Sequence, residues 1–394
     1  MMIPMNRHVL LGLATALGLC AQPNTLTTKE AADGWILLFD GATLFGWTPS
    51  GGADWRASDG ALVADSGGPG WLRHNTRFAD YLLHCEFRTA ADGNSGVFLR
   101  SAVEGAPHQT GYELQIFDTQ PAGFHTGSLV GHAKMQKHLR IKPAQWMSFD
   151  VEVRGNHFVV KLDGEQVLDA RDSKSAAGHL GLQYNRDKKI EFRNIKLKPL
   201  GLEPIFNGKD LKGWQVVESP RPRETPVWSV KDGAIHVEKG PGQLETEGTW
   251  KDFVLQLDIR TNPRDASHQP NSGVFFRGDV KGYWSGYESQ IRNEFKDGDP
   301  TQPVDWGTGA IYNRQAARRV VPKDGDYFTK TLVANGRHFS VWINGYPVTD
   351  WRDDRPEGAN ARQQARLTAG TLSLQAHDPT TNLDFRNLRI VSLP

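Results

Sequence analysis

The chain has few cysteines, almost no net charge and only one long apolar run, and each of these features excludes a class of protein. Only two of its 394 residues are cysteine, and beyond residue 21 only Cys85 remains, so the body of the chain cannot form an intramolecular disulfide. The net charge of +1 gives no electrostatic basis for binding nucleic acid or an anionic membrane. A hydrophobic core must therefore stabilise the protein without covalent cross-links.

The one long apolar run, VLLGLATALGLC, extends from Val9 to Cys20. It is too short to span a bilayer, which needs about 20 apolar residues, so no transmembrane segment is predicted. A basic start, an apolar middle and small residues behind it predict a secretory signal over residues 1–21. Cleavage after Ala21 and lipidation of Cys20, in a stretch that resembles a lipobox, both remain open. Either outcome predicts a secreted or periplasmic protein, which in the second case is lipid-anchored through Cys20.

Several catalytic and structural signatures are also missing. The sequence contains no HExxH, no paired CxxC, no GxSxG and no phosphate-binding glycine loop, and no long amphipathic helix is evident. Glycine (41), proline (22) and tryptophan (12) are plentiful, and alternating segments such as 157–164 and 338–345 end in Asp-Gly or Asn-Gly turns. Many short strands with glycine-rich turns predict an all-β protein built from antiparallel sandwiches of the jelly-roll or concanavalin-like kind.

The chain repeats itself. Six blocks recur in the same order, which indicates a tandem duplication of a domain spanning residues 34–199 and 202–394, joined by a short, proline-containing linker. The matched blocks are LFDGATLFGW and IFNGKDLKGW, WRASDGALV and WSVKDGAIH, GYELQI and GYESQI, HTGSLV and GTGAIY, KLDGEQVLD and WINGYPVTD, and EFRNIKL and DFRNLRI.

A repeated phrase, NSGVFLR at 94–100 and NSGVFFR at 271–277, ends in arginine both times. Side chains in a strand alternate between faces, so strand neighbours would bring Arg277, Glu288 and Gln290 to one sheet face. The same alternation would gather Arg100, Glu113 and Gln115 in the first copy. We expect a polar constellation on a concave surface of the kind that binds sugars, although a cross-strand Arg–Glu pair could instead only stabilise a half-exposed sheet.

Further along, the two copies differ. Gln375 and His377 alternate onto one face, whereas the first copy has Gln183 followed by Asn185. His377 could be structural, or it could form with Glu288 an acid–base pair that works near neutral pH.

Aromatic and acidic residues add further candidates. Tyr312 replaces a valine of the first copy, and Trp284 and Trp306 lie in loops where they could stack on a sugar ring. A loop from 296 to 307 carries three aspartates, Asp297, Asp299 and Asp305. Oxygen ligands of this kind could hold calcium or a similar divalent metal, but a solvated acidic loop is the alternative, and no cofactor is assigned with certainty.

As a set, seven motifs of the chain resemble those of the 3-keto-disaccharide (3-keto-glycoside) hydrolase family, formerly a domain of unknown function. These motifs are LFDGxxLxGW, NSGVFxR, GYExQI, TGAIY, WING, LQxH and FRN. The resemblance covers nearly all of the chain beyond the signal, twice. It implies a concanavalin-type β-sandwich acting on glycosides whose C3 hydroxyl has been oxidised to a ketone.

Such a substrate would need a base to remove the acidified C2 hydrogen, a group to stabilise the enolate oxygen and an acid for the leaving group. For this chemistry we expect Glu288 to act as the base and His377 as the acid or a second base. Arg277, together with Gln290, is expected to anchor the oxyanion or a sugar oxygen. The substrate-binding candidates are Gln290, Tyr312, Gln375, Trp284 and Trp306 in the second copy and Arg100, Glu113, Gln115 and Gln183 in the first. Two-carboxylate glycosidase chemistry and a non-catalytic, lectin-like carbohydrate-binding protein remain competing interpretations, and a structural module attached to a surface assembly is a third.

Overall fold

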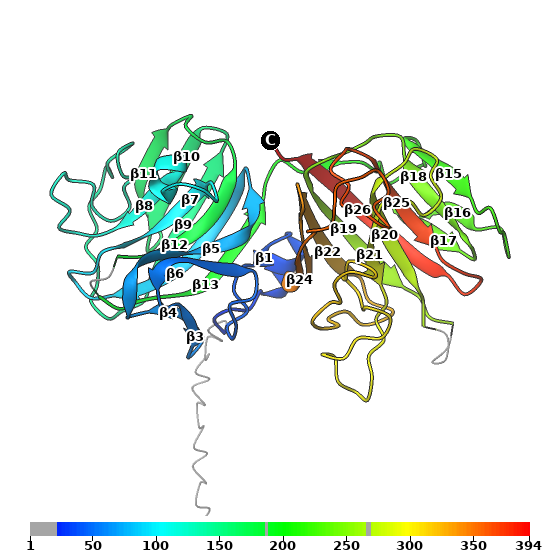
Figure 1. Ribbon diagram of the computed structural model, residues 1–394, viewed down its shortest axis with the longest axis horizontal. Coiled ribbons are helices and arrows are strands. Elements are labelled where there is room, and N and C mark those ends of the chain that lie inside the picture. The colour runs from blue at the N-terminus through cyan, green and yellow to red at the C-terminus, as the bar shows by residue number, and fades with distance from the viewer. Residues whose placement is uncertain (1–21, 186–187, 265–268) are drawn as a thin grey trace, which may run out of the picture.

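The computed structural model describes residues 22–185, 188–264 and 269–394, and the predicted signal over residues 1–21, with Cys20, lies outside them. Figure 1 shows two β-sandwiches side by side. Each consists of an eight-stranded and a five-stranded sheet whose strands pair antiparallel. This confirms the predicted all-β fold. The described residues form two short helices, α1 (Thr28–Ala32) and α2 (Pro107–Thr110). Within them, no helix is long and apolar enough to cross a membrane.

The first repeat contains strands β1 to β13. In spatial order its larger sheet consists of β11 (Glu165–Arg171), β10 (His157–Leu162), β9 (Met147–Arg154), β6 (Tyr81–Thr89), β13 (Ile190–Pro199), β4 (Ala61–Ala64) and β3 (Arg56–Ser58), with β1 (Ile36–Leu37) also beside β13. Its smaller sheet consists of β2 (Trp47–Ala53), β5 (Gly67–Phe78), β12 (Gly178–Tyr184), β7 (Ser95–Ser101) and β8 (Tyr112–Ile116).

The second repeat reproduces this arrangement with strands β14 to β26. Its larger sheet consists of β16 (Val227–Lys231), β17 (Ala234–Glu238), β26 (Asn382–Ser392), β19 (Phe253–Thr261), β22 (Phe328–Asn335), β23 (His338–Ile343) and β24 (Tyr346–Arg352), with β14 (Glu203–Pro204) also beside β26. Its smaller sheet consists of β15 (Trp214–Glu218), β18 (Gly242–Thr246), β25 (Thr371–Ala376), β20 (Ser272–Gly278) and β21 (Tyr287–Ile291).

Each sandwich buries its own apolar core between its two sheets. Strand β6 shows the underlying pattern, because every second residue from Tyr81 to Thr89 is buried and the intervening ones are half-buried. Cys85 belongs to the inward set and is fully buried. Burial raises the pKa of its thiol, so Cys85 is an unreactive part of the core.

The two repeats are packed against each other. Trp342 of the second repeat belongs to the core of the first, where its indole nitrogen donates to the carbonyl oxygen of Leu37 at 2.8 Å and its ring stacks on His74. The buried hydroxyl of Thr76 donates to that of Ser340 at 2.8 Å. Buried apolar and polar contacts of this kind join the sandwiches into one body.

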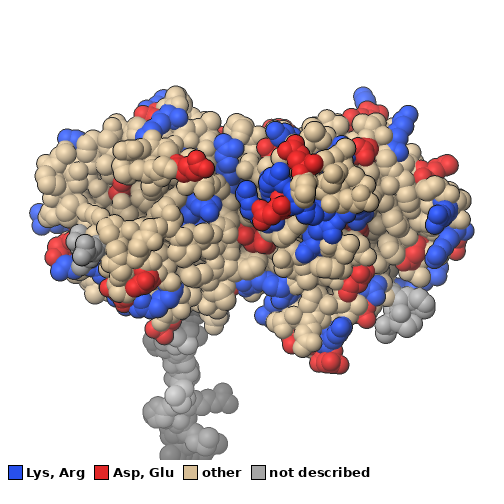
Figure 2. Space-filling model, viewed as in Figure 1, with Lys and Arg blue, Asp and Glu red and all other residues tan. Residues whose placement is uncertain are grey.

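Charged side chains of both signs are interspersed over the face of the molecule shown in Figure 2. This mixture agrees with the balanced count of 46 basic and 45 acidic residues.

Candidate functional site

The smaller sheet of the second repeat presents one face to the core and one to the outside. On β21, Tyr287 and Ile291 belong to the core, so the alternating residues Glu288 and Gln290 lie on the outer face. Antiparallel pairing with β20 places Gly273 opposite Gln290. On the other side of β20, β25 contributes Gln375 to the same outer face.

The glycine of the repeated NSGVF phrase makes room for the glutamate. A Cβ at Gly273 would lie 2.5 Å from Oε1 and 2.8 Å from Cγ of Glu288, so any larger residue there would displace the glutamate side chain. Gly96 has the same relation to Glu113, because a Cβ there would lie 3.0 Å from the glutamate Cγ. The serine of the phrase is also explained, since the hydroxyl of Ser272 donates to the carbonyl oxygen of Gln375 and ties β20 to β25.

A cavity of about 290 Å³ opens on this face. That size lies near the lower end of the range of about 300–1,000 Å³ usual for small-molecule sites. Six predicted residues line it: Glu288, Gln290, Tyr312, Gln375, Trp284 and His377. Three further residues, which were not predicted to lie together here, complete the lining: Asn271, Asp305 and Arg362.

The predicted placement of Arg277 in this cavity is wrong. Its φ of +53° interrupts the strand alternation at the bulge in β20, and the side chain lies fully buried instead. The guanidinium pairs with Asp252 at 2.8 Å and donates to the carbonyl oxygens of Gly336 and Arg366, both at 2.7 Å. Arg277 therefore connects the smaller sheet to neighbouring loops and has no access to a ligand.

The predicted placement of Arg100 on the outer face of the first repeat is wrong for the same reason. It too has a positive φ, +52°, and its fully buried guanidinium pairs with Asp80 at 2.8 Å. The arginine that ends the repeated phrase is thus an element of the fold in both copies, conserved between them by a common structural role.

Arg362, from the long connection before β25, supplies the cationic group of the cavity instead. Its guanidinium donates to Oε2 of Glu288 at 3.1 Å and lies over the ring of Phe275. Burial raises the pKa of Glu288, whereas Arg362 and His377 act in the opposite direction. A carboxylate with a raised pKa in a cavity is well suited to exchange a proton at moderate pH.

His377 stands at the end of β25 with its ring held on two sides. Its Nδ1 pairs with Asp378 at 2.7 Å, and its ring stacks on the indole of Trp284 with centroids 5.5 Å apart. Burial acts to raise the pKa of Asp378, but its hydrogen bonds, first among them the one to His377, outweigh burial and lower that pKa below its ordinary value. A carboxylate that fixes one ring nitrogen leaves the other, Nε2, oriented for proton transfer.

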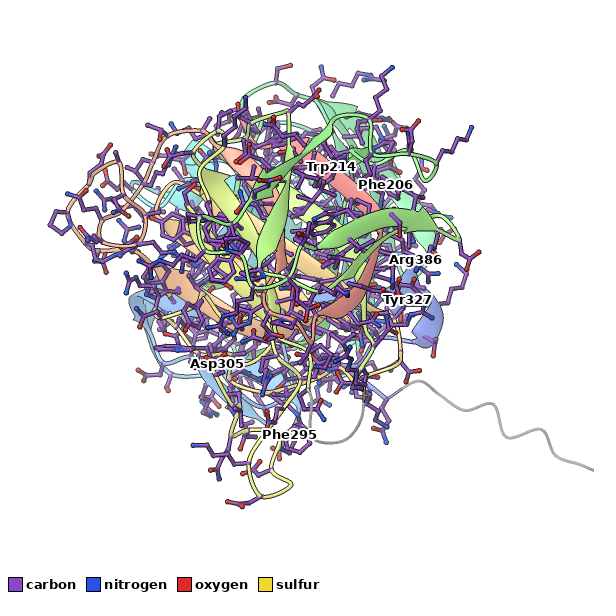
Figure 3. All side chains as sticks on the ribbon, turned by 90° about the vertical axis from the view of Figure 1, so that its right-hand side faces the viewer. Phe206, Trp214, Phe295, Asp305, Tyr327 and Arg386 are labelled. Carbon is purple, nitrogen blue, oxygen red and sulfur yellow. The ribbon has the colours of Figure 1, made fainter. Side chains whose placement is uncertain are left out.

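Asp305 reaches the cavity from the loop that follows β21. Its Oδ2 accepts from the amide of Gln290 at 3.0 Å and from that of Asn271 at 3.1 Å. In Figure 3, Asp305 lies near the strands, while Phe295 lies farther out in the same projecting loop. Two amide donors on one oxygen fix the position of the Asp305 side chain at the cavity.

Unsatisfied polar atoms gather at the cavity wall. Among the described residues, the buried Oδ1 of Asn271 and the Oε1 atoms of Gln290 and Gln375 have no hydrogen-bond partner, and neither has Nε1 of Trp284. Buried polar atoms without partners are costly unless a ligand or water satisfies them. Three acceptors beside two carboxylates suit a ligand rich in hydroxyl donors.

Two residues of β18 that belong to no predicted motif, Gln243 and Glu245, hold the loop of Trp284 in place. The backbone amide of Trp284 donates to Oε1 of Gln243, and that of Lys281 donates to Glu245, so β18 fastens the loop onto the sheet. Trp284 adopts a φ of +47°, which is uncommon for a bulky residue and is typical of a functional site that the surroundings hold under strain.

A family model of the 3-keto-alpha-glucoside-1,2-lyase-like domain matches residues 34–198 and again residues 201–391. The chain belongs to this family. Both matches together cover most of its length, and the tandem arrangement expected from the internal repeat is confirmed.

Solved structures similar to one repeat carry carbohydrate-related names. A candidate glycosyl hydrolase from Parabacteroides distasonis is 24% identical with a TM-score of 0.41, and the match covers 45% of this chain and 100% of that one. The carbohydrate-binding module CBM66 from Bacillus subtilis is 20% identical with a TM-score of 0.32, over 38% of this chain and 94% of that one. A comparison with curated protein sequences finds no match.

The two lyase-like repeats share a backbone framework around the glutamate that both contain. The amide of Tyr312 donates to the carbonyl oxygen of Glu288 at 2.9 Å, and Val130 makes the same bond to Glu113. These bonds identify Val130 as the counterpart of Tyr312. The first repeat therefore has the glutamate, whose pKa burial raises to about 7, without the tyrosine.

The outer face of the first repeat also has a different shape. Register places Trp71 beside Gln183, where the second repeat has Gln243 beside Gln375. Trp71 packs edge-on against Phe98 and lies so close to Gly181 that a Cβ there would be 2.1 Å from the indole. An indole thus occupies the surface that is open in the second repeat.

The other predicted site residues lie outside this cavity. Gln115 and Gln183 lie near Glu113 on the smaller sheet, and Trp306 packs edge-on against Tyr312 without lining the cavity. Asp297 is exposed, and Asp299 bonds Thr301 within its own loop. In the described part of the chain, no group of three or more His, Cys, Asp or Glu side chains is arranged to hold a metal ion.

Proposed function

We propose that the second repeat cleaves 3-keto-glucosides by removing the C2 proton and eliminating the C1 substituent, after which water adds. The observation that carries the proposal is the pairing, in one cavity, of a buried glutamate that has a raised pKa with a histidine fixed by a carboxylate. Membership of the lyase-like family supports the same substrate class.

In the first step, the Glu288 carboxylate takes the hydrogen on C2, which the neighbouring ketone acidifies, and the electron pair moves to the C3 oxygen as an enolate. The guanidinium of Arg362, which borders the cavity, is the cation available to stabilise that negative charge. It takes the role that the sequence had suggested for Arg277.

In the second step, the enolate re-forms the C3 ketone, a C1–C2 double bond forms, and the bond from C1 to the leaving oxygen breaks. Protonated His377 gives its proton to that oxygen, so the aglycone departs as an alcohol. Water then adds to the double bond, with its hydroxyl group on C1 and a proton on C2. The sum is hydrolysis to 3-keto-glucose and the free aglycone.

Asp305 places a second carboxylate in the cavity, so two-carboxylate glycosidase chemistry has to be considered as an alternative. That chemistry requires one carboxyl group to act as a proton donor. Oδ2 of Asp305 already accepts hydrogen bonds from the amides of Asn271 and Gln290, which hold this side chain against the cavity wall. The unpaired amide oxygens are equally compatible with a carbohydrate-binding site that has no activity.

One experiment separates the three possibilities. The purified protein is incubated with a methyl 3-keto-glucoside and with its unoxidised parent, and release of methanol and exchange of the C2 hydrogen with solvent deuterium are followed. Turnover of the keto compound alone, with deuterium at C2, is the expected result. Turnover of the unoxidised glucoside would favour the two-carboxylate route, and binding of either compound without turnover would favour the lectin.

Matched variants assign the reaction to a repeat. Glu288→Gln is expected to abolish turnover while the protein stays folded by circular dichroism. Glu113→Gln makes the equivalent change in the first repeat, where Trp71 occupies the open surface, and should leave turnover intact. An inactive Glu113→Gln protein beside an active Glu288→Gln protein would move the site to the first repeat.

A further inference from the structure

A second cavity, of about 610 Å³, adjoins the first one in the second repeat. Two residues, Trp284 and His377, line both cavities. The other lining residues of the second cavity are Ser219, Pro220, Arg221, Arg223, Pro241, Tyr283 and Asp378. The imidazole that would protonate the leaving oxygen is therefore at the boundary between a small polar cavity and a larger one.

An aromatic stack forms part of this boundary. The ring of Tyr283 lies parallel to that of Trp284 with centroids 4.8 Å apart, and Trp284 in turn stacks on His377 at 5.5 Å. Pro220 and Pro241 add further apolar surface to the lining. The stacked rings and the two prolines form an aromatic and apolar wall that suits a planar, apolar group rather than a second hydroxyl-rich sugar.

The charges of the second cavity are unbalanced. In the part of the chain that the structure describes, Arg221 and Arg223 have no carboxylate partner within 4.0 Å, and the nearby Glu224 pairs with Lys239 instead. The lining contains one carboxylate, Asp378, which is already bound to His377 and Thr380. Two guanidinium groups are thus available to a negatively charged ligand.

The loop that carries both arginines belongs to the second repeat alone. It spans residues 219–226, between the end of β15 at Glu218 and the start of β16 at Val227. In the first repeat the equivalent strands are joined by residues 54–55 only, since β2 ends at Ala53 and β3 begins at Arg56. The arginine loop therefore accompanies the complete cavity and is missing beside the incomplete one.

We propose that the second cavity is the leaving-group subsite and that it takes an aromatic aglycone bearing an acidic substituent. The inference rests on the proposed elimination in the adjoining cavity and adds to it the chemical class of the aglycone. The aryl ring packs on the Tyr283–Trp284 wall, the carboxylate faces Arg221 and Arg223, and the oxygen bound to C1 lies beside His377.

The test compares two 3-keto-glucosides that differ in one charge, those of 4-hydroxybenzoate and of its methyl ester. The ratio of their kcat/KM values is measured for the native protein and for the Arg221→Gln/Arg223→Gln variant. Because both arginines are exposed, we expect the double substitution to lower the preference for the acid about 5- to 20-fold. Raising the salt concentration should lower it in the native protein as well.

The matched control is Arg140→Gln/Arg171→Gln, which removes two exposed arginines of the first repeat and should leave the ratio unchanged. An unaltered ratio in the Arg221→Gln/Arg223→Gln protein would overturn the proposal, and so would an equal loss in the control.

Binding of free 4-hydroxybenzoate, measured by calorimetry, separates this inference from the proposed reaction because it requires no turnover. Tighter binding to the native protein than to the Arg221→Gln/Arg223→Gln variant supports the subsite even if no 3-keto-glucoside is cleaved. Equal binding to both proteins overturns the subsite even if cleavage proceeds.

Discussion

Lys330 of the second repeat occupies the position that Phe149 holds in the first. Lys330 pairs with Ile343 across β22 and β23, and Phe149 pairs with Leu162 across the equivalent strands. The side-chain nitrogen of Lys330 is fully buried and donates to the carbonyl oxygens of Ser289 at 3.0 Å and Gln290 at 2.9 Å. A polar support thus lies behind the strand that carries Glu288 and Gln290, where the first repeat has an aromatic ring.

The stability of the protein is predicted to depend on the titration of Lys330. Burial lowers its pKa from 10.5 to about 7, so between these values the unfolded chain binds the proton that the folded chain does not. This group therefore makes the free energy of unfolding rise with pH from about 7 to about 10. Urea denaturation at pH 7 and pH 9.5 should show the rise in the native protein and a smaller rise in Lys330→Met. An identical pH dependence in both would contradict the prediction.

The activity is predicted to rise with pH through the pKa of Glu288. A general base must be ionised, and burial raises the pKa of this carboxyl group above its ordinary value of about 4.3. The acidic limb of the kcat/KM profile should therefore lie above that value. Removing the Arg362 guanidinium, which counteracts the effect of burial, should move the limb higher still in Arg362→Met. A limb at an ordinary glutamate pKa, or one that Arg362→Met does not shift, would argue against Glu288 as the base.

The effect of replacing His377 is predicted to depend on the leaving group. His377→Asn introduces the residue that the first repeat has at Asn185. For methyl 3-keto-glucoside, whose leaving oxygen needs a proton, we expect kcat to fall about 10²- to 10⁴-fold. For the 4-nitrophenyl compound, whose leaving group departs as an anion, the loss should be far smaller. Equal losses for both substrates would show that His377 does not act as the acid.

Arg277 is predicted to affect stability rather than chemistry. Arg277→Met removes the partner of Asp252 and three hydrogen bonds to backbone carbonyl groups, and should lower the free energy of unfolding by about 3–5 kcal/mol. The folded fraction at low temperature should keep its kcat and its pH profile. A normal denaturation midpoint combined with a lost or pH-shifted kcat would instead return Arg277 to the mechanism.

The sequence by itself determined the duplication, the all-β fold and part of the constellation at the site. Strand alternation is a local rule, so it correctly placed Glu288 and Gln290 on one face, and the internal repeat identified which strands to compare. The same rule failed at Arg277, because a left-handed residue at a bulge reverses the direction of its side chain. Nothing in the heptapeptide itself signals that bulge.

The tertiary structure decided which cation and which second carboxylate reach the cavity. Arg362 and Asp305 belong to loops whose path depends on packing against the sheet, and their neighbours at the site are distant in sequence, as the Arg362–Glu288 pair shows. In the sequence, Lys330 is indistinguishable from an ordinary polar residue of a strand. Its role follows only from the fold, because the opposite sheet places backbone carbonyl groups beside it. Alternation specifies a face, whereas only the packed fold specifies which side chains meet on it, because loop paths and strand bulges follow from contacts made across the whole sandwich.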